Sequence, residues 1–238
     1  MLPQTYLPLF SKLPANRESR WMLVLRFVDF WSRPIAPGDG YSEADIEQCE
    51  RELGHRLPAA LREWYLIAGR RRDLWSQQDR LTTPNELFQF GRHENHLVFY
   101  AENQGCEVWG VRDSDILLED PPVYRLKEDP CQVSPSVSAF AIQTLLREKI
   151  MGAPCCGWQD FWEQRRLLAD LGSQYSLCDL PLTYWSVMEP LRFYEGEDIL
   201  LMTHADQWLF VGARNSTARR KLPVEIFSRL EWVAGEFA

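Results

Sequence analysis

The sequence predicts an α+β fold with a largely antiparallel mixed sheet wrapped by helices. Helical patterns cluster at the beginning of the chain, a hairpin and further helices follow, and a run of short strands comes near the end. Regular alternation of strands and helices would instead indicate a parallel sheet. The 238 residues, 45% of them hydrophobic and 25% charged, suffice for one well-buried core or two small ones. We expect a single domain over 1–238.

Three helices are expected in the first part of the chain. One lies near 18–31, and a connection over 33–40 that contains Pro and Gly follows it. The other two lie within 41–69 and meet at a Gly-x-x-Leu-Pro corner. Ser42 and Asp45 form a capping-box pattern at the start of this segment. Glycines that can end the helices, a proline suited to a first turn and apolar residues at helical spacing complete the pattern: Ile46, Cys49, Leu53, Gly54, Leu57, Pro58, Leu61, Trp64, Tyr65, Ala68 and Gly69.

A β-hairpin is expected next. The residues of 97–100 and 108–111 are apolar and favour strands, and Gln104 with Gly105 can turn the chain between them. Two prolines at 121–122 remove backbone donors, so the following strand should begin at about Val123.

The middle of the chain is predicted to be helical over 136–172. A helix fits 136–151, where Phe140, Thr144 and Leu145 recur at helical offsets together with Glu148. A second helix fits 158–171, and Gly172 can end it. No motif is evident over 127–183, so this part is a candidate insertion that creates a specific surface.

The C-terminal part, 191–235, predicts an antiparallel meander and a helix. The strands are expected at 191–194, 199–203 and 208–211, and the turn Glu-Gly-Glu-Asp separates the first two. A final helix is expected from about 223 to 233, with Ile226, Phe227 and Leu230 on its buried side.

Two segments, 41–69 and 96–124, carry short motifs in a characteristic order. The matching positions are Glu50, Gly54, Leu57, Pro58, Tyr65, Gly69, Glu102, Asn103, Gln104, Gly105, Trp109, Gly110, Asp120, Pro121, Pro122 and Val123. This arrangement over 41–124 resembles the signature of the SUKH immunity-protein superfamily, which includes fungal cell-wall-assembly regulators. The resemblance implies a mixed sheet wrapped by helices. We expect structural roles for Leu57, Pro58, Tyr65, Gly69, Gly105, Gly110 and Pro122.

The same resemblance implies a function in binding. Bacterial members are small cytosolic proteins that bind and neutralise the toxin domain of a polymorphic toxin system, and many such toxins are nucleases with basic clefts. The expected partner is therefore a cognate, basic protein toxin. A regulatory or scaffold module without a toxin partner, as in the fungal relatives, is the alternative hypothesis.

Charge agrees with a protein partner better than with a nucleic acid. The net charge is −8 and the isoelectric point is about 5.1, whereas binding a nucleic-acid backbone requires a clustered positive surface. Over 94–129, acidic residues outnumber Lys and Arg by nine to three. This excess is either ordinary solubilising charge or an acidic face that attracts a basic partner. The candidate contact residues are Tyr100, Glu102, Glu107, Trp109, Asp113, Asp115 and Tyr124, with the aromatic side chains expected to be exposed.

No motif indicates catalysis, a cofactor or a metal. The phosphate-binding loop, the Gly-x-Gly-x-x-Gly, Gly-x-Ser-x-Gly and His-Glu-x-x-His patterns are all absent. Carboxylate pairs such as Glu102 and Glu107 arise by chance in any acidic chain, so we expect no enzyme. The six cysteines form no regular framework and are expected to be reduced, with Cys49 and Cys106 as small core residues; His93 with His96 is expected in a solvated loop.

The sequence also predicts a cytoplasmic location. The apolar run 21–31 is interrupted by Arg26 and Asp29 and is too short to span a bilayer. The first residues lack the basic start, apolar middle and cleavage site of a signal peptide. The oligomeric state is not predicted.

Overall fold

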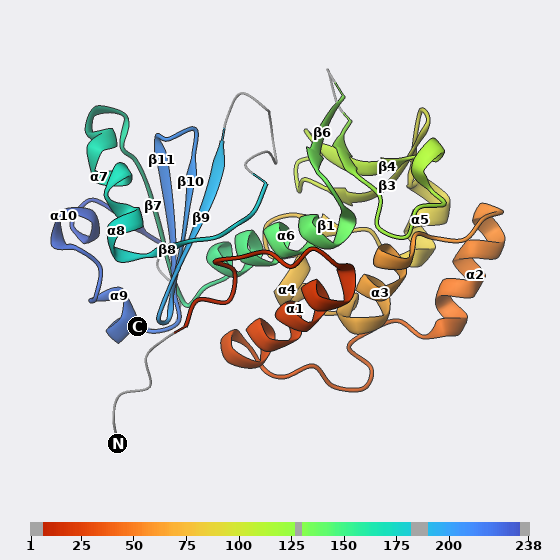
Figure 1. The fold of residues 1–238 in the computed structure, drawn as a ribbon, viewed down its shortest axis with the longest axis horizontal. Helices are drawn as coiled ribbons and strands as arrows, with labels where there is room; N and C mark the ends of the chain where they lie inside the picture. The colour runs from red at the N-terminus through yellow and green to blue at the C-terminus, as the bar shows by residue number, and fades with distance from the viewer. Residues whose placement is uncertain (1–6, 127–129, 182–189, 234–238) are drawn as a thin grey trace.

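The computed structural model describes residues 7–126, 130–181 and 190–233. Within these ranges the fold is α+β, as predicted, but it contains two antiparallel sheets of six strands each instead of one mixed sheet. The sheets lie on opposite sides of the long helix α6 (Figure 1). No helix of the described ranges is long and apolar enough to cross a membrane.

The N-terminal helices form where the capping patterns place them. Ser42 and Asp45 make a full capping box, and Gly54 ends that helix with a φ of 78°, in the left-handed region that glycine tolerates. Asn16 caps the first helix by accepting a hydrogen bond from the backbone N–H of Ser19 at 2.8 Å. The helices are α1 Arg17–Trp31, α2 Glu43–Leu53, α3 Ala59–Ala68, α4 Arg72–Trp75 and α5 Pro84–Phe90.

The first sheet is built around the predicted hairpin. Strand β3 pairs with β4, and Gly105 turns the chain between them with a φ of 72°. The sheet has the order β1-β3-β4-β5-β6, and β2 pairs with β3. Its strands are β1 Arg80–Leu81, β2 Arg92–His93, β3 His96–Ala101, β4 Val108–Arg112, β5 Val123–Arg125 and β6 Cys131–Ser134. The short 3-10 helix η1, Asp113–Asp115, follows β4.

Helix α6, Val137–Met151, is the centre of the fold. It is buried on nearly all sides, because it contacts α1, α3 and α4 on one side and strands β10 and β11 on the other. Phe140 and Leu145 on this helix belong to the same hydrophobic core as Trp64 of α3 and Leu200 of β10. The helix predicted for 136–151 is therefore confirmed, and it joins the two sheets.

The second sheet contains the predicted meander. Its order is β12-β7-β11-β10-β9-β8. One face packs on α6, and a second core on the other face lies under a series of short helices. The strands are β7 Cys155–Asp160, β8 Ser176–Leu177, β9 Leu191–Gly196, β10 Ile199–His204, β11 Trp208–Ala213 and β12 Glu231–Trp232. The helices are η2 Trp162–Gln164, α7 Arg165–Ala169, α8 Leu171–Gln174, α9 Ser216–Arg219 and α10 Val224–Phe227.

Two predicted helices are wrong. Residues 155–160 of the middle segment form β7, which pairs with β11 and β12, and only short helical turns follow. A Cβ at Gly157 would lie 2.8 Å from the ring of Trp232, so this strand fits closely against β12. The helix expected over 223–233 is limited to Val224–Phe227, because the chain then pairs with β7 as β12.

Candidate protein-interaction surface

The three aromatic residues predicted as contact residues lie inside the protein. Tyr100 and Trp109 are fully buried and pack on each other with ring centroids 5.7 Å apart. Tyr124 is also buried, beneath the guanidinium of Arg112 at 3.9 Å from the ring centroid. The expectation that these side chains are exposed is therefore wrong. They stabilise the first sheet and its core.

The predicted acidic residues divide into two pairs. Glu102 accepts hydrogen bonds from the backbone N–H groups of the hairpin turn at 2.8 and 3.0 Å, and Glu107 pairs with Arg125 at 3.2 Å. The Glu102 carboxylate therefore holds the hairpin turn in shape, and the Glu107 carboxylate joins the hairpin to β5. Asp113 and Asp115 lie at the surface on η1, where Asp113 pairs with Arg92.

The residues expected to have structural roles have close neighbours in the core. Tyr65 is fully buried and donates its hydroxyl hydrogen bond to a backbone carbonyl at 2.6 Å. A Cβ at Gly110 would lie 2.5 Å from the carbonyl oxygen of Leu97 on the paired strand, and one at Gly69 would lie 2.8 Å from the Cα of Tyr65. Leu57 and Pro58 are buried at the corner, and Pro122 is half-buried before β5.

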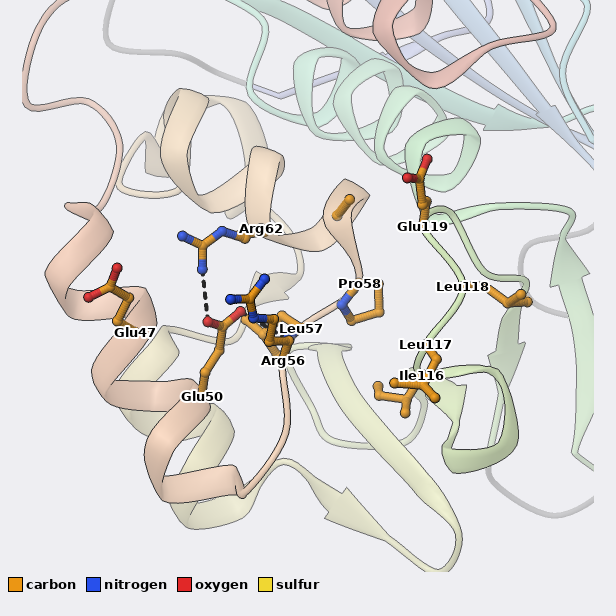
Figure 2. A pocket seen from close by; sticks show the side chains of 11 residues that line it. Glu47, Glu50, Arg56, Leu57, Pro58, Arg62, Ile116, Leu117, Leu118 and Glu119 are labelled. Atoms are coloured by element: carbon orange, nitrogen blue, oxygen red, sulfur yellow. Dashed lines mark hydrogen bonds and ion pairs between the residues drawn. The ribbon is translucent and has the colours of Figure 1, made fainter.

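A cleft opens beside the Gly-x-x-Leu-Pro corner. It has a volume of about 430 Å³ and lies between α2, the start of α3 and the loop 116–119. Figure 2 shows Glu47 and Glu50 on one side, the loop on the other, and Pro58 between them. The lining residues are Glu47, Glu50, Arg56, Leu57, Pro58, Ala59, Arg62, Ile116, Leu117, Leu118 and Glu119. The cleft therefore combines apolar and charged side chains.

The loop side of the cleft exposes two adjacent leucines. Leu117 is 85% exposed and Leu118 is 51% exposed. Scattered single leucines are normal on a protein surface, but a pair beside a cleft forms an apolar patch of the kind found at binding sites. The sequence contained a signal for this patch, because Ile-Leu-Leu interrupts an acidic stretch directly before Glu-Asp-Pro-Pro.

The backbone on either side of these leucines is held by hydrogen bonds. The amide of Leu118 donates to the carbonyl of Asp115 at 2.9 Å, and the amide of Ala60 donates to the carbonyl of Glu119 at 2.8 Å. The second bond satisfies one of the open N–H groups at the start of α3. The Glu119 carboxylate also pairs with Arg17 of α1 at 2.8 Å. The leucines are thus presented by a fixed loop.

The charged groups of the cleft differ in how far they are already paired. Glu50 accepts from the backbone N–H of Leu57 at 3.0 Å and from Arg62 at 2.9 Å, and Arg62 also pairs with Glu43. These contacts tie the corner to both helices. Glu47 is different, because its side chain is 58% exposed and its ion pair with Arg51 is long, at 4.0 Å.

A buried polar cluster lies elsewhere, between α6 and the chain before β1. Glu148 is fully buried and accepts from Tyr100 and Arg147, each at 3.2 Å, and Arg147 also pairs with Asp79. Burial raises the pKa of Asp79 to about 6, although the charge of Arg147 acts in the opposite direction. Because Glu148 also accepts backbone N–H groups of the neighbouring loop, we assign this cluster a structural role.

The cysteines and histidines form no evident site. Cys49 is buried as expected, and burial raises the pKa of its thiol to about 11. Cys106 is exposed, so its assignment to the core is wrong, because it lies in the hairpin turn. His96 belongs to β3 and is buried against Tyr124, not solvated in a loop. In the part of the chain that the structure describes, no group of three or more His, Cys, Asp or Glu residues is arranged to hold a metal ion.

Comparison with protein-family models, curated protein sequences and solved structures finds no match for this chain.

Proposed function

We propose that this protein is a non-enzymatic immunity protein that binds and neutralises a cognate, basic toxin domain in the bacterial cytosol. The proposal draws on the resemblance of 41–124 to the SUKH superfamily. The structural observation that supports it is the exposed pair Leu117 and Leu118, held on a fixed loop beside a cleft with carboxylates at its edge. An apolar patch surrounded by charge is a common form of protein-binding site.

The charge of the chain suits this function. A net charge of −8 attracts a basic partner over a distance and speeds the encounter. A toxin that cleaves nucleic acid needs a positive surface for the phosphate backbone, so an acidic binder can cover that surface without any chemistry of its own. Contact with the leucines then supplies short-range affinity that salt does not screen.

The test is a viability assay. The C-terminal domain encoded by the gene directly upstream is expressed in bacteria with and without this chain, and viable cells are counted. We expect killing that this chain relieves, and a stoichiometric complex when the two purified proteins are mixed. A harmless neighbour, or one that kills equally in both cultures, would contradict the proposal and favour a regulatory or scaffold module.

A further inference from the structure

We propose that the cleft beside the Leu-Pro corner binds a partner segment in which an apolar side chain stands next to a lysine or arginine. Leu117 and Leu118 contact the apolar side chain, and Glu47 pairs with the cation. The inference rests on the proposed function as a protein binder. It adds the location of the site and the chemistry of the segment that the site recognises.

The apolar part follows from the exposure of the leucines. Neither side chain contributes much to the core, since most of Leu117 and half of Leu118 face solvent. The half-buried Ile116 lines the cleft beside the leucines, and the buried Leu57 and Pro58 add apolar surface from the corner. An inserted apolar group would therefore be enclosed on two sides. Side chains that dominate the binding energy of an interface are usually enclosed in this way, whereas side chains at the solvent-exposed rim contribute little.

The fixed loop raises the affinity that this contact can provide. Binding to a flexible loop loses affinity, because the loop must be ordered at the same time. Here the loop is already tied to α3 through Ala60 and to α1 through Arg17, each at 2.8 Å. The leucines thus occupy their binding positions before the partner arrives.

The cationic part follows from the balance of charges. Glu47, Glu50 and Glu119 line the cleft against Arg56 and Arg62. Arg62 lies between Glu43 and Glu50, so its charge is more than balanced within the protein. The carboxylate of Glu119 is already paired with Arg17 at 2.8 Å, whereas Glu47, with a side chain 58% exposed, has only the long ion pair with Arg51 at 4.0 Å. The weakly paired carboxylate of Glu47 therefore favours a cation on the partner.

Arg56 is a basic residue of the cleft, and its replacement tests the sign of the charge on the bound segment. Its side chain is exposed at the cleft. If the segment carries a cation, Arg56 weakens binding by repulsion, and Arg56→Glu should tighten it. A segment that carries an anion would show the reverse.

A library of random peptides displayed on phage tests the proposal without knowledge of the toxin. The purified full chain is the bait, and bound peptides are sequenced, synthesised and titrated by calorimetry. We expect enrichment of an aliphatic or aromatic residue adjacent to lysine or arginine, with affinity that falls as salt increases. Peptides rich in Asp or Glu, or the absence of any selected peptide, would overturn the proposal.

Matched variants locate the binding site. Leu117→Ser with Leu118→Ser should weaken the selected peptides at least tenfold, whereas Leu177→Ser, at a side chain 49% exposed on β8, should leave affinity unchanged. Glu47→Lys should weaken binding severalfold, and Glu225→Lys on α10 should not. Unfolding curves of all variants exclude loss of structure as the cause.

Two further results would also overturn the proposal. One is unchanged affinity in the double leucine variant. The other is a wild-type dimer in sedimentation experiments that the same variant converts to a monomer, because the cleft would then bind a second copy of this chain. The viability assay is separate. A peptide that binds the cleft while the upstream gene proves harmless would refute the immunity function and leave the site in place.

Discussion

Replacement of Glu148 should destabilise the whole fold. This carboxylate on α6 is fully buried and accepts backbone N–H groups of Gln77 at 2.5 Å, Gln78 at 2.6 Å and Asp79 at 3.2 Å. These residues connect α4 to β1, so a single side chain joins the central helix to the first sheet. The Tyr100 hydroxyl also donates to it, at 3.2 Å.

The magnitude follows from the donors that the variant leaves open. A hydrogen bond to a charged group contributes about 1.5–3 kcal/mol, so loss of three would cost about 4.5–9 kcal/mol if nothing relaxed. Gln77 is exposed, however, and its N–H can bind water after a small movement. Removal of one partner from a buried charged cluster typically costs about 3–5 kcal/mol. We therefore expect Glu148→Ala to lower the free energy of unfolding by about 4 kcal/mol.

Urea unfolding followed by circular dichroism measures this change. Glu148→Gln keeps one acceptor oxygen for the loop and should lose about half as much, about 2 kcal/mol. Glu225→Ala, at an exposed position of α10, serves as the control and should change stability by less than about 0.5 kcal/mol. A loss below about 1 kcal/mol for Glu148→Ala would refute the assignment of this carboxylate as the joint between helix and sheet.

Three further predictions concern stability. Burial raises the pKa of Asp79 from 3.8 to about 6. Between these two pH values the folded protein keeps a proton that the unfolded chain has released. The contribution of this site to the free energy of unfolding is therefore greatest below about pH 4 and is lost, by about 3 kcal/mol, as the pH rises through 6. Asp79→Asn should flatten that part of a plot of unfolding free energy against pH, and an unchanged slope would contradict the assignment. Gly40→Ala places a Cβ 1.7 Å from a carbonyl oxygen of α3 and should lower the melting temperature markedly, whereas Gly172→Ala, with open space around it, should not. Leu117→Ser with Leu118→Ser should leave the melting temperature within about 2 °C of the wild type, since exposed leucines add little to the core; a large drop would show that they support the fold.

The elements that the sequence predicted correctly depend on local signals. The capping box of Ser42 and Asp45, the left-handed Gly54 and the turn at Gly105 each act within a few residues of their position. Such local signals predict the same structure whatever the sequence of the rest of the chain. The hairpin and the C-terminal meander were predictable for the same reason, because short turns join neighbouring strands.

The error over 158–171 has a long-range cause. The apolar residues of this segment also fit helical spacing, but Trp158 pairs with Phe210 on β11 and with Glu231 on β12. Both partners lie more than fifty residues further along the chain. Pairing of this kind overrides local preference and cannot be inferred from the segment itself.

The site was only partly predictable, because periodicity does not report exposure in this sheet. Five successive residues of β3, from His96 to Tyr100, are buried, so alternation along the strand does not separate an inner from an outer face. The sequence pattern therefore did not reveal that the side chains of Tyr100 and Trp109 are buried in the core. Two carboxylates of the acidic stretch are already used inside the protein, because Glu102 accepts N–H groups of the hairpin turn and Glu107 pairs with Arg125 on β5.

The Asp-Pro-Pro segment after the leucines explains how an exposed patch can remain ordered. Asp120 accepts the backbone N–H of Ser138 at the start of α6 at 2.9 Å and pairs with Arg20 of α1 at 3.3 Å. The carbonyl of Pro121 accepts the N–H of Val137 at 2.9 Å. The residues that follow the leucines are therefore tied to the start of α6, a helix whose side chains are nearly all buried. Substitutions at Leu117 and Leu118 can therefore change the exposed surface while Asp120 and Pro121 keep the loop in place.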